Sequence, residues 1–573
     1  MSREVQEQIF NEELLDVSGG LNLVTGEMGL GKSETSNMIN YELRPGGVGL
    51  DKTLGFEELL DTIPETIQDT YVYISADVRQ VVDGIIYLKK SVRKELIVYA
   101  WPKIYKLQSD LSIVTELGRI KSKGDPFFIQ KGPELIIMDG KNPMKYYDGV
   151  NMTDVTDIQV YSLPNATVID SVDAQAASAF TQIRTSGFKF GAIYRQRLIA
   201  SDGSNTIFFS QPNDITNFVD NSGSDIEVAG YVSLDSKTPV TAMANISDGL
   251  IIYTINEIHQ LSGDNPATFG GDETNPFLLE RVIDGIGAVN QYCVAIREQS
   301  DHFFLSEKGL FTLALSDNFL TLRPGALSFK IQPAFDLLGS ALKRSRIYNM
   351  PHLGQLWVVT PRRKTHIIRD KIWKLNYAVI SQQQDSSVSS RREIDAAINM
   401  PWTQHEKFGM YANIQCISVW PVGNRVLMAH KNKLYEANKG LEFFDGEPIY
   451  SNWDFSPNRL GSVRLLKTIH DYYGTYDSPT GADVSLAHSW TNKNDGVTPL
   501  KLVNTITDEY GSGSYGNAGY SSAAVQDQGD FLLPIDGDDS GRIFKLSVTH
   551  ASNTQTFSIF SIVISGVTGG MGA

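Results

Sequence analysis

The sequence predicts an all-β protein with few short helices, and three observations predict it. Short apolar bursts bounded by Gly, Asn, Asp and Pro recur along the whole chain, which is the strand-and-turn pattern. Glycine, at 49 residues, outnumbers proline, at 22, and aromatic residues make up 10%, as in chains of many short strands. Helical periodicity is confined to residues 3–15, 33–43 and 334–348, where we expect short helices.

The apolar bursts repeat at a spacing that predicts a β-propeller of six or seven blades. Each burst follows a turn, and several are followed within a dozen residues by a second strand. The bursts begin at Leu96, Leu135, Leu198, Leu250, Phe303, Leu356 and Val426. Between Leu198 and Leu356 the bursts lie about 52–53 residues apart, close to the length of a propeller blade. The alternative is a set of unrelated hairpins in two sandwiches; the regular spacing favours the propeller, with each burst as an inner strand.

Changes in residue composition and pattern along the sequence divide the chain into three parts. Residues 1–49 are predicted to form an N-terminal arm with a Gly-rich segment, and residues 50–455 the propeller with inserted loops. Residues 456–573 are predicted to form an additional C-terminal β-domain. We expect a long loop or arm over residues 476–530, which include the Gly/Ser/Tyr-rich stretch 511–522. Residues 541–566 alternate at period two around a polar turn, as in a β-hairpin or a sandwich edge.

Composition and charge exclude several classes of protein. The net charge of −16 argues against a protein that grips nucleic acid by counterion release, which needs clustered Lys and Arg. Cys293 and Cys416 lie far apart and follow no metal-ligand spacing, which excludes a disulfide scaffold and a structural zinc site. The chain has no run of eighteen apolar residues and begins with a polar stretch, so we expect no membrane anchor and folding in a reducing cytoplasm.

One segment matches a nucleotide-binding pattern. Residues Gly26–Ser33 fit GxxxxGK[ST], in which the glycine backbone would cradle phosphates, Lys32 would neutralise them and Ser33 would bind magnesium. Asp139 is a candidate second carboxylate. A P-loop domain, however, needs parallel strands alternating with long helices, and residues 70–140 supply strand after strand. We therefore interpret this segment as structural.

Other candidate sites are weak. Asp536–Asp539 reads as an acidic turn, the histidines are scattered (His259, His302 and His430 among them), and no nucleophile elbow or repeated Asp-box occurs. We assign no catalytic, cofactor-binding or metal-binding residue. The only basic concentration comprises Arg362-Arg363-Lys364 with Arg344, Arg346, Arg369 and Lys371 nearby. We interpret it as a solvated loop, and the alternative is a docking face for an acidic partner.

A series of short motifs runs in a fixed order from residue 19 to about 315. In order they are Gly19-Gly-Leu-Asn22, Glu34, Asn40, Gly46-Gly47, Lys52-Thr-Leu-Gly55-Phe56, Leu135-Ile-Ile-Met-Asp-Gly140, Met144-Lys-Tyr-Tyr-Asp148-Gly149, Tyr194-Arg-Gln-Arg197-Leu198, Phe209-Ser210-Gln-Pro212-Asn-Asp214 with Phe218, Gly285-Ile-Gly-Ala-Val-Asn290 and Phe304-Leu-Ser306-Glu-Lys-Gly309-Leu310. This order resembles the tail nozzle family of short-tailed bacteriophages, also called the tail hub or tail tubular protein B family. The family varies beyond the propeller, so the resemblance says little about the last 120 residues or so.

The resemblance implies a structural virion protein without enzymatic activity, made in the host cytoplasm and built into the phage tail. Such proteins usually form a ring of six below the portal and the adaptor, the head–tail connector. The ring conducts genomic DNA during ejection without binding it specifically, and offers contacts for tail fibres, tailspikes or a needle. An acidic channel wall suits this role, because basic walls would bind phosphates. The alternatives are a P-loop ATPase using Gly26–Ser33 and a propeller that binds or cleaves glycans with paired carboxylates.

Overall fold

The computed structural model describes most of the chain, with gaps. The residues described are 8–14, 19–25, 30–31, 33–43, 49–60, 63–75, 78–82, 85–89, 92–111, 114–155, 158–160, 181–183, 187–218, 229–236, 238–246, 249–264, 277–298, 301–315, 322–377, 401–409, 411–457, 467–479, 481–490, 493–502, 529–534, 540–541 and 543–568. The stretch 511–522 and the acidic turn 536–539 lie outside these residues, as do Gly26–Gly29 and Lys32 of the GxxxxGK[ST] match.

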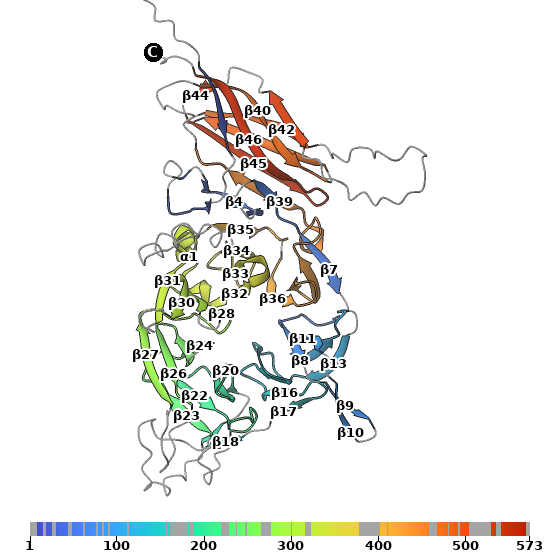
Figure 1. The fold of residues 1–573 in the computed structure, drawn as a ribbon, viewed down its shortest axis with the longest axis vertical. Coiled ribbons are helices and arrows are strands. Elements are labelled where there is room, and N and C mark those ends of the chain that lie inside the picture. Colours follow the sequence, from blue (N-terminus) through green and yellow to red (C-terminus); the bar gives the residue numbers. More distant parts are fainter. Residues whose placement is uncertain are drawn as a thin grey trace, which may run out of the picture.

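Within the described residues the fold is all-β, with seven four-stranded antiparallel sheets arranged as the blades of a propeller (Figure 1). Blade 1 contains β8 (Asp69–Ser75), β11 (Arg93–Ala100), β12 (Lys103–Leu107) and β13 (Val114–Arg119). Blade 2 contains β14 (Phe127–Lys131), β15 (Glu134–Met138), β16 (Lys145–Tyr147) and β17 (Met152–Asp154). Blade 3 contains β20 (Phe190–Tyr194), β21 (Arg197–Ser201), β22 (Thr206–Phe209) and β23 (Gly230–Ser233). Blades 4 and 5 are β24 (Val240–Ile246), β25 (Gly249–Thr254), β26 (Glu257–Ser262), β27 (Leu278–Asp284); and β28 (Val294–Glu298), β29 (Asp301–Ser306), β30 (Gly309–Leu315), β31 (Leu322–Ala326). Blades 6 and 7 are β32 (Arg346–Met350), β33 (Gln355–Thr360), β34 (Lys371–Asn376), β35 (Trp402–Glu406); and β36 (Ile414–Trp420), β37 (Arg425–His430), β38 (Lys433–Ala437), β7 (Phe56–Leu60).

The ring is closed by an early strand. β7 precedes blade 1 in the chain but pairs with β38, so it is the outermost strand of blade 7. The first strands of neighbouring blades contact one another around the axis, as β8 and β36 do across the closure. Because the blades are antiparallel, every first strand begins at the same face of the propeller, which we call the start face. The turns between second and third strands and the connections between blades also lie at this face.

All seven apolar bursts fall on the second strand of a blade, rather than on the inner strand that the sequence predicts. All seven anchor residues, from Leu96 to Val426, lie in strands that have a neighbouring strand on each side. A second strand has a strand at each edge and lies between neighbouring blades, so most of its residues are buried, as in β25 and β33. The first strands border the axis and carry polar residues, which hid them from a search for apolar bursts.

The helices of the described residues are few and short. A helix was expected over residues 334–348, and this range contains most of α1 (Gln332–Leu338) and all of the 3-10 helix η5 (Gly339–Arg344). Other 3-10 helices are η4 (Phe329–Ile331), η6 (Pro351–Leu353) and η7 (Phe444–Gly446). The helices expected over 3–15 and 33–43 are wrong: these stretches contain β1 (Gln8–Glu13), β3 (Glu34–Thr35), β4 (Met38–Ile39) and β5 (Tyr41–Leu43). Strand partners elsewhere in the chain override the weak local periodicity. Two hairpins, β9 (Val78–Val82) with β10 (Ile85–Lys89) and β18 (Ile158–Val160) with β19 (Thr181–Ile183), form sheets of their own.

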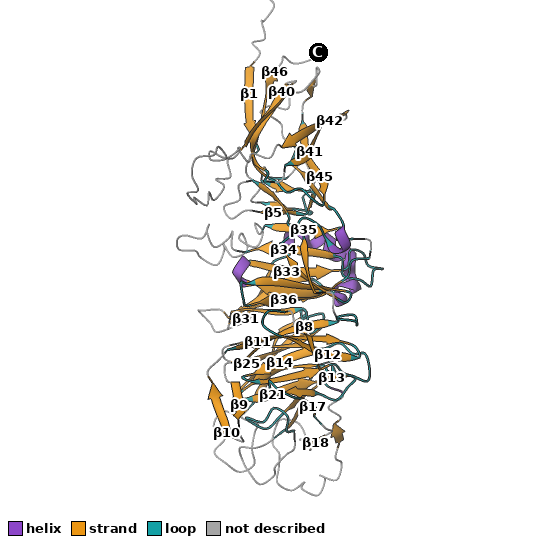
Figure 2. Cartoon of the chain, turned by 90° about the vertical axis from the view of Figure 1, so that its right-hand side faces the viewer, coloured by secondary structure: helices purple, strands orange, loops and turns teal. Residues whose placement is uncertain are grey.

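Both ends of the chain form a β-sandwich beside the propeller (Figures 1 and 2). One sheet contains β43 (Gly529–Pro534), β40 (Lys467–Asp477), β46 (Ser558–Thr568), β6 (Leu50–Lys52), β5, β1 and β44 (Ser540–Gly541); the other contains β4, β39 (Ile449–Asp454), β45 (Phe544–Ser552), β41 (Ala482–Trp490) and β42 (Lys493–Leu502). Strands of the predicted arm 1–49 therefore pair with the C-terminal part of the chain, and β39, inside the predicted propeller range, belongs to the sandwich. Strands also occupy much of 476–502, where a loop was expected.

The last two strands do not form the expected hairpin. β45 pairs with β39 and β41, whereas β46 pairs with β40, β1 and β6 in the opposite sheet. Every second residue of β45 from Phe544 to His550 is buried, and in β46 Ile562 and Ile564 are buried against the same core. Both strands present an apolar face to the space between the sheets, so the chain crosses from one sheet to the other after Ser552.

Candidate functional site

The part of the GxxxxGK[ST] match that is described does not have P-loop geometry. A P-loop passes from its lysine into a helix whose free N–H groups bind phosphate. Here Ser33 precedes β3, which pairs in parallel with β2 (Gly20–Leu21). The Gly31 N–H donates to Glu34 Oε2 at 3.1 Å, so a carboxylate of the chain itself occupies one of the donors of this segment. Asp139, the candidate second carboxylate, accepts hydrogen bonds from Tyr99 and Asn142 in a turn of blade 2.

Glu34 instead ties the N-terminal segment to the propeller. Its Oε1 lies 2.9 Å from Lys330 Nζ of η4, and its Oε2 accepts a hydrogen bond from Asn22 Nδ2 at 2.9 Å. Lys330 is buried and also donates to the Gly19 carbonyl at 2.8 Å. Burial alone would raise the pKa of Glu34, but the hydrogen bonds from Lys330 and Asn22 outweigh it and the pKa is lowered. Glu34 is therefore held charged.

Asn40 joins the propeller to the sandwich through hydrogen bonds of its side chain and backbone. Asn40 Oδ1 accepts from the Glu406 N–H at 3.0 Å, and Asn40 Nδ2 donates to the carbonyls of Glu406 at 2.9 Å and Tyr450 at 2.7 Å. The Asn40 N–H donates to the Gln404 carbonyl at 2.9 Å. The fully buried amide thus extends the pairing of β35 in blade 6 and reaches β39 in the sandwich. Its left-handed backbone, with φ of 56°, is a conformation that asparagine tolerates.

Two motif glycines lie where the N-terminal segment touches neighbouring backbone. A Cβ on Gly55 would lie 1.9 Å from the Glu442 carbonyl oxygen, a distance that no side chain tolerates. Gly20 has φ of +62°, and a Cβ there would lie 2.7 Å from the Trp402 carbonyl oxygen. Any larger residue at these positions would push the segment off blades 6 and 7.

Buried charges and histidines line the same junction. Lys52 Nζ donates to the carbonyls of Ser552 at 3.1 Å and Gln555 at 2.6 Å, and burial lowers its pKa to about 8. Lys374 of β34 forms an ion pair with Glu42 of β5. His405 lies between Thr53 Oγ1 at 3.2 Å and Thr403 Oγ1 at 2.9 Å; burial, with the charge of Lys374, lowers the pKa of His405 well below its ordinary value.

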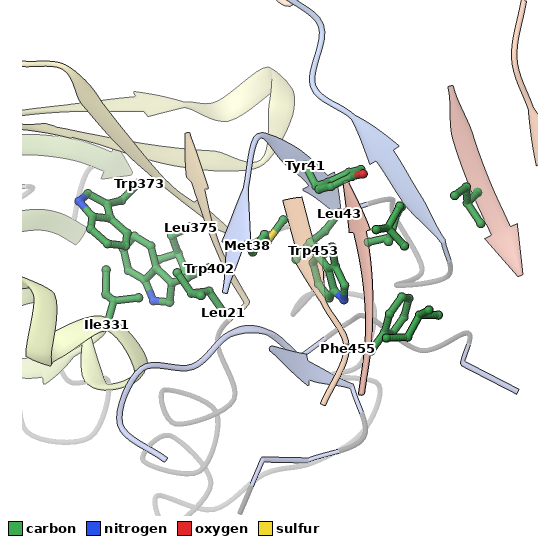
Figure 3. Packing of buried hydrophobic residues seen from close by; sticks show 14 of the residues in the cluster. Leu21, Met38, Tyr41, Leu43, Ile331, Trp373, Leu375, Trp402, Trp453 and Phe455 are labelled. Carbon is green, nitrogen blue, oxygen red and sulfur yellow. The ribbon is translucent and has the colours of Figure 1, made fainter. Parts of the chain in front are cut away.

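The apolar contacts of the junction are continuous (Figure 3). Leu21 and Met38 lie beside Trp402 of blade 6, and on the other side of β4 and β5 Trp453 of β39 extends the same cluster. We call the described residues from Gly19 to Gly55 the N-terminal strap. The strap is bonded to blade 6 and blade 7 on one side and is part of both sandwich sheets on the other. The N-terminal strap therefore joins the propeller and the sandwich to each other.

The propeller axis is crossed by buried ionic groups at the start face. Arg346 of blade 6 forms an ion pair with Asp69 of blade 1 at 2.8 Å, and the guanidinium lies 3.8 Å from the ring centre of Tyr292. Tyr292, before blade 5, donates across the axis to the Pro126 carbonyl, before blade 2, at 2.6 Å. Burial raises the pKa of Asp69 despite the opposing charge of Arg346. Burial would lower the pKa of Arg346, but the charge of Asp69 raises it well above its ordinary value.

Further groups fill the same region. Arg369 donates to the carbonyls of Ile414 at 2.9 Å and Gln415 at 2.6 Å. Both cysteines are free and buried: Cys416 Sγ lies 3.3 Å from Thr70 Oγ1, and Cys293 Sγ lies 3.1 Å from the Ser345 carbonyl. Burial raises the pKa of both thiols, that of Cys416 to about 12. At the level of these residues, near the start face, packed side chains fill the propeller axis.

The basic concentration found in the sequence is dispersed by the fold. Arg346 and Arg369 point into the axis, and Lys371 pairs with Glu406 at 3.4 Å. Arg362 pairs with Asp370 at 3.3 Å, whereas Arg344, Arg363 and Lys364 are exposed on the start face. The histidines do not gather into a cluster; His302, for example, has its Nδ1 3.1 Å from the Tyr253 hydroxyl. Within the described ranges, no group of three or more His, Cys, Asp or Glu is placed to hold a metal ion, and no helix there is long and apolar enough to cross a membrane.

Sequence reasoning singled out Glu34, Asn40 and the motif glycines through the order of the motifs, and the structure gathers them at one junction. It missed Lys330, Asp69 and the axial role of Arg346. Asp69 and Arg346 are each a charged residue at the start of a strand-like stretch. Charged residues are common at such positions because turns precede strands, so this pattern alone does not reveal the ion pair. Lys330 lies 296 positions after its partner Glu34, and nothing in the sequence links the two.

Comparison with known proteins identifies no family for this chain. No protein-family model and no curated protein matches it. Among solved structures it is similar to the WD40 repeats of RRP9 (7% identity, 68% of this chain and 99% of that one, TM-score 0.36) and the C-terminal WD40 domain of Sif2 (8%, 67% and 98%, 0.32). It is also similar to Kluyveromyces lactis Hsv2 (11%, 69% and 93%, 0.33). All three TM-scores are low, so the description of the propeller rests on the strand pairing of this chain.

Proposed function

We propose that this chain is a structural component of the tail of a short-tailed bacteriophage. In this proposal six copies form a nozzle ring below the portal and adaptor, conduct DNA during ejection and provide docking for fibres, spikes or a needle. The observation that carries the proposal is the N-terminal strap. The motif residues that resemble the nozzle family, Asn22, Glu34, Asn40 and Gly55 among them, bond two β-domains into one body. A part that must bear load during ejection needs such a joint.

The filled propeller axis determines where a conduit would run. With Arg346, Asp69 and Tyr292 bonded across the axis, duplex DNA has no path through a single propeller. The proposed channel therefore lies between copies, enclosed by the ring. This arrangement explains why the axis can be used for stability, since buried, paired charges there need not accommodate a passing polyanion.

The charge of the chain suits a channel that releases DNA. Each copy carries a net charge of −16, and a ring repeats this charge around its bore. A negative wall repels phosphates, and at physiological ionic strength the repulsion is screened beyond about 8 Å. DNA would then be kept from the wall without being attracted to it, and no counterions would be displaced by binding.

Two measurements on the purified full-length protein test the proposal. Cryo-EM class averages are expected to show rings with six-fold symmetry, and the same protein is expected to bind labelled duplex DNA no better than serum albumin at physiological salt. A monomer at every concentration tested, or a ring that binds duplex DNA tightly, would contradict the proposal. Exchange of channel-facing carboxylates for lysine, once the ring structure identifies them, is expected to slow DNA ejection and leave assembly intact.

A further inference from the structure

The start face carries exposed basic side chains that have no ion pair among the described residues. Arg363 and Lys364 lie at the tip of the loop from 361 to 370 in blade 6. The one acid of that loop, Asp370, is already paired with Arg362 at 3.3 Å. Arg344 is exposed beside them, and its guanidinium donates to the His366 carbonyl at 2.7 Å, which leaves its charge unneutralised. Three positive charges therefore lie together on a protein that is acidic overall.

Two more exposed lysines lie on the start face, in a connection that also carries the exposed Asp125. Lys121 and Lys123 are exposed in the connection from blade 1 to blade 2, and neither has an ion pair in the part of the chain that is described. The hydrogen bond between Tyr292 and Pro126 joins this connection to the blade 5 side. Below the mouth of the axis, Arg346 and Arg369 outnumber Asp69, so the buried groups add to the positive potential.

Exposed apolar side chains lie among these charges. Ile367 is 78% exposed and Tyr411 is 75% exposed, although side chains of this size are usually covered. Their two loops are joined where the Arg369 N–H donates to Asn413 Oδ1 at 3.0 Å, so they belong to one surface. Trp101, 41% exposed in the β11–β12 turn of blade 1, lies on the same face. Exposed aromatic and apolar groups beside arginine are the composition of protein interfaces.

We propose that the start face over blades 6, 7 and 1 binds an acidic segment of a partner protein that also carries apolar side chains. Carboxylates of the segment pair with Arg344, Arg363 and Lys364, and its apolar residues cover Ile367 and Tyr411. The exposed apolar groups commit the surface to a protein rather than to DNA, because the phosphates of a duplex would gain nothing from Ile367 and Tyr411, whereas the apolar side chains of a peptide would cover them. The inference locates a contact within the proposed docking role and rests on that role only for which protein supplies the segment.

A charge-reversal pair tests the surface on the full-length protein. The probe is a fluorescent peptide of glutamates with interspersed phenylalanines, and fluorescence anisotropy measures its binding. Arg363→Glu with Lys364→Glu is expected to weaken binding at least about tenfold, the loss of roughly 1.4 kcal/mol. The matched control is Lys94→Glu with Lys501→Glu, which changes the net charge equally but lies off the start face; it is expected to bind like the unmodified protein.

A second variant and a second probe separate the parts of the inference. Ile367→Ser with Tyr411→Ser is expected to weaken binding several-fold without changing its salt dependence, because no charge is removed. Equal loss in the charge-reversal pair and its control, or tighter binding of labelled duplex DNA than of the peptide, would overturn the proposal. Ring symmetry of the unmodified protein is recorded separately, so a failed ring tests the nozzle function and a failed peptide titration tests this surface.

Discussion

The propeller and the sandwich are both antiparallel β structures, but they are assembled from the chain in opposite ways. In the propeller, pairs form between strands that follow one another in the sequence, except that the β9–β10 hairpin is inserted between β8 and β11, and β7 with β38 is the only long-range closure among the described blades. In the sandwich, β1 pairs with β46, and β4 with β39, so that residues near 10 and near 560 are neighbours. The propeller blades are built mainly from strands that are close in sequence, whereas the sandwich depends on strands that are far apart in sequence.

This difference shows what each region depends on. A blade is specified by its own hairpins, and its weak point is the axis, where unlike blades must satisfy buried charges together. The sandwich has less local support, from β41 with β42 and from β5 with β6, and removing the N-terminal strap would take strands from both of its sheets. We therefore expect axial substitutions to act on the propeller and strap substitutions to act first on the sandwich.

The largest effect is expected at the axis. Asp69→Ala should destabilise the protein by about 3–5 kcal/mol, because it leaves the Arg346 guanidinium buried without its partner. Chemical denaturation followed by tryptophan fluorescence measures the change. Asp69→Leu combined with Arg346→Met should recover most of the loss, since no unpaired charge remains. Equal instability of the single and double variants would mean that packing, not the ion pair, holds the blades together.

The strap is expected to give the next largest effect. Asn40→Ala should cost about 3 kcal/mol, because Glu406 and Tyr450 lose buried hydrogen-bond partners and alanine is strained at a positive φ. Asn40→Gly relieves only the backbone strain, so it should recover about 1 kcal/mol. The control is Asn424→Ala, an exposed asparagine with φ of 51° that carries only the backbone cost. Calorimetry should show a separate, earlier unfolding transition of the sandwich; a single transition shifted as a whole would contradict the division.

A smaller effect is expected from pH, and substitution assigns part of it to one residue of the sandwich. Burial, with the charge of Lys52, lowers the pKa of His550 to about 4, so the folded protein holds this imidazole neutral. Above pH 6.5 the imidazole is neutral in both states and the stabilisation is complete; as the pH falls toward 4 the unfolded state binds the proton first and stability is lost. From pH 7 to pH 5 this amounts to about 2 kcal/mol. Denaturation curves of His550→Gln should lose this part of the slope, and an unchanged slope would rule His550 out.

The smallest effect is expected at the segment that matches a P-loop. Lys32→Ala should change the free energy of unfolding by less than about 0.5 kcal/mol, as ordinary surface substitutions do. Isothermal titration with ATP and Mg²⁺ should give no heat for either protein. Binding by the unmodified protein that the substitution abolishes would revive the ATPase alternative for Gly26–Ser33.

Sequence reasoning was strongest for features repeated by local pairing. The seven bursts, from Leu96 to Val426, all mark second strands, which have a strand at each edge and are buried along most of their length. It failed where partners are distant: residues 33–43 were expected to form a short helix, whereas β39 pairs with Met38 and Ile39 and β6 pairs with Leu43 as strands. The motif residues Glu34 and Asn40 were found by their order, but their contacts were not.

By itself, the sequence determined the strand content, the blade repeat and the acidic charge, because these depend on residue type and on neighbours along the chain. Tertiary structure alone decided that both chain ends share a sandwich, that Arg346 closes the axis with Asp69, and that Lys330 holds Glu34. The physical reason is that a buried polar or charged group must be satisfied by whichever group the fold brings within about 3 Å. That partner is chosen by the closure of the ring and the packing of the sheets, over distances that no local pattern records.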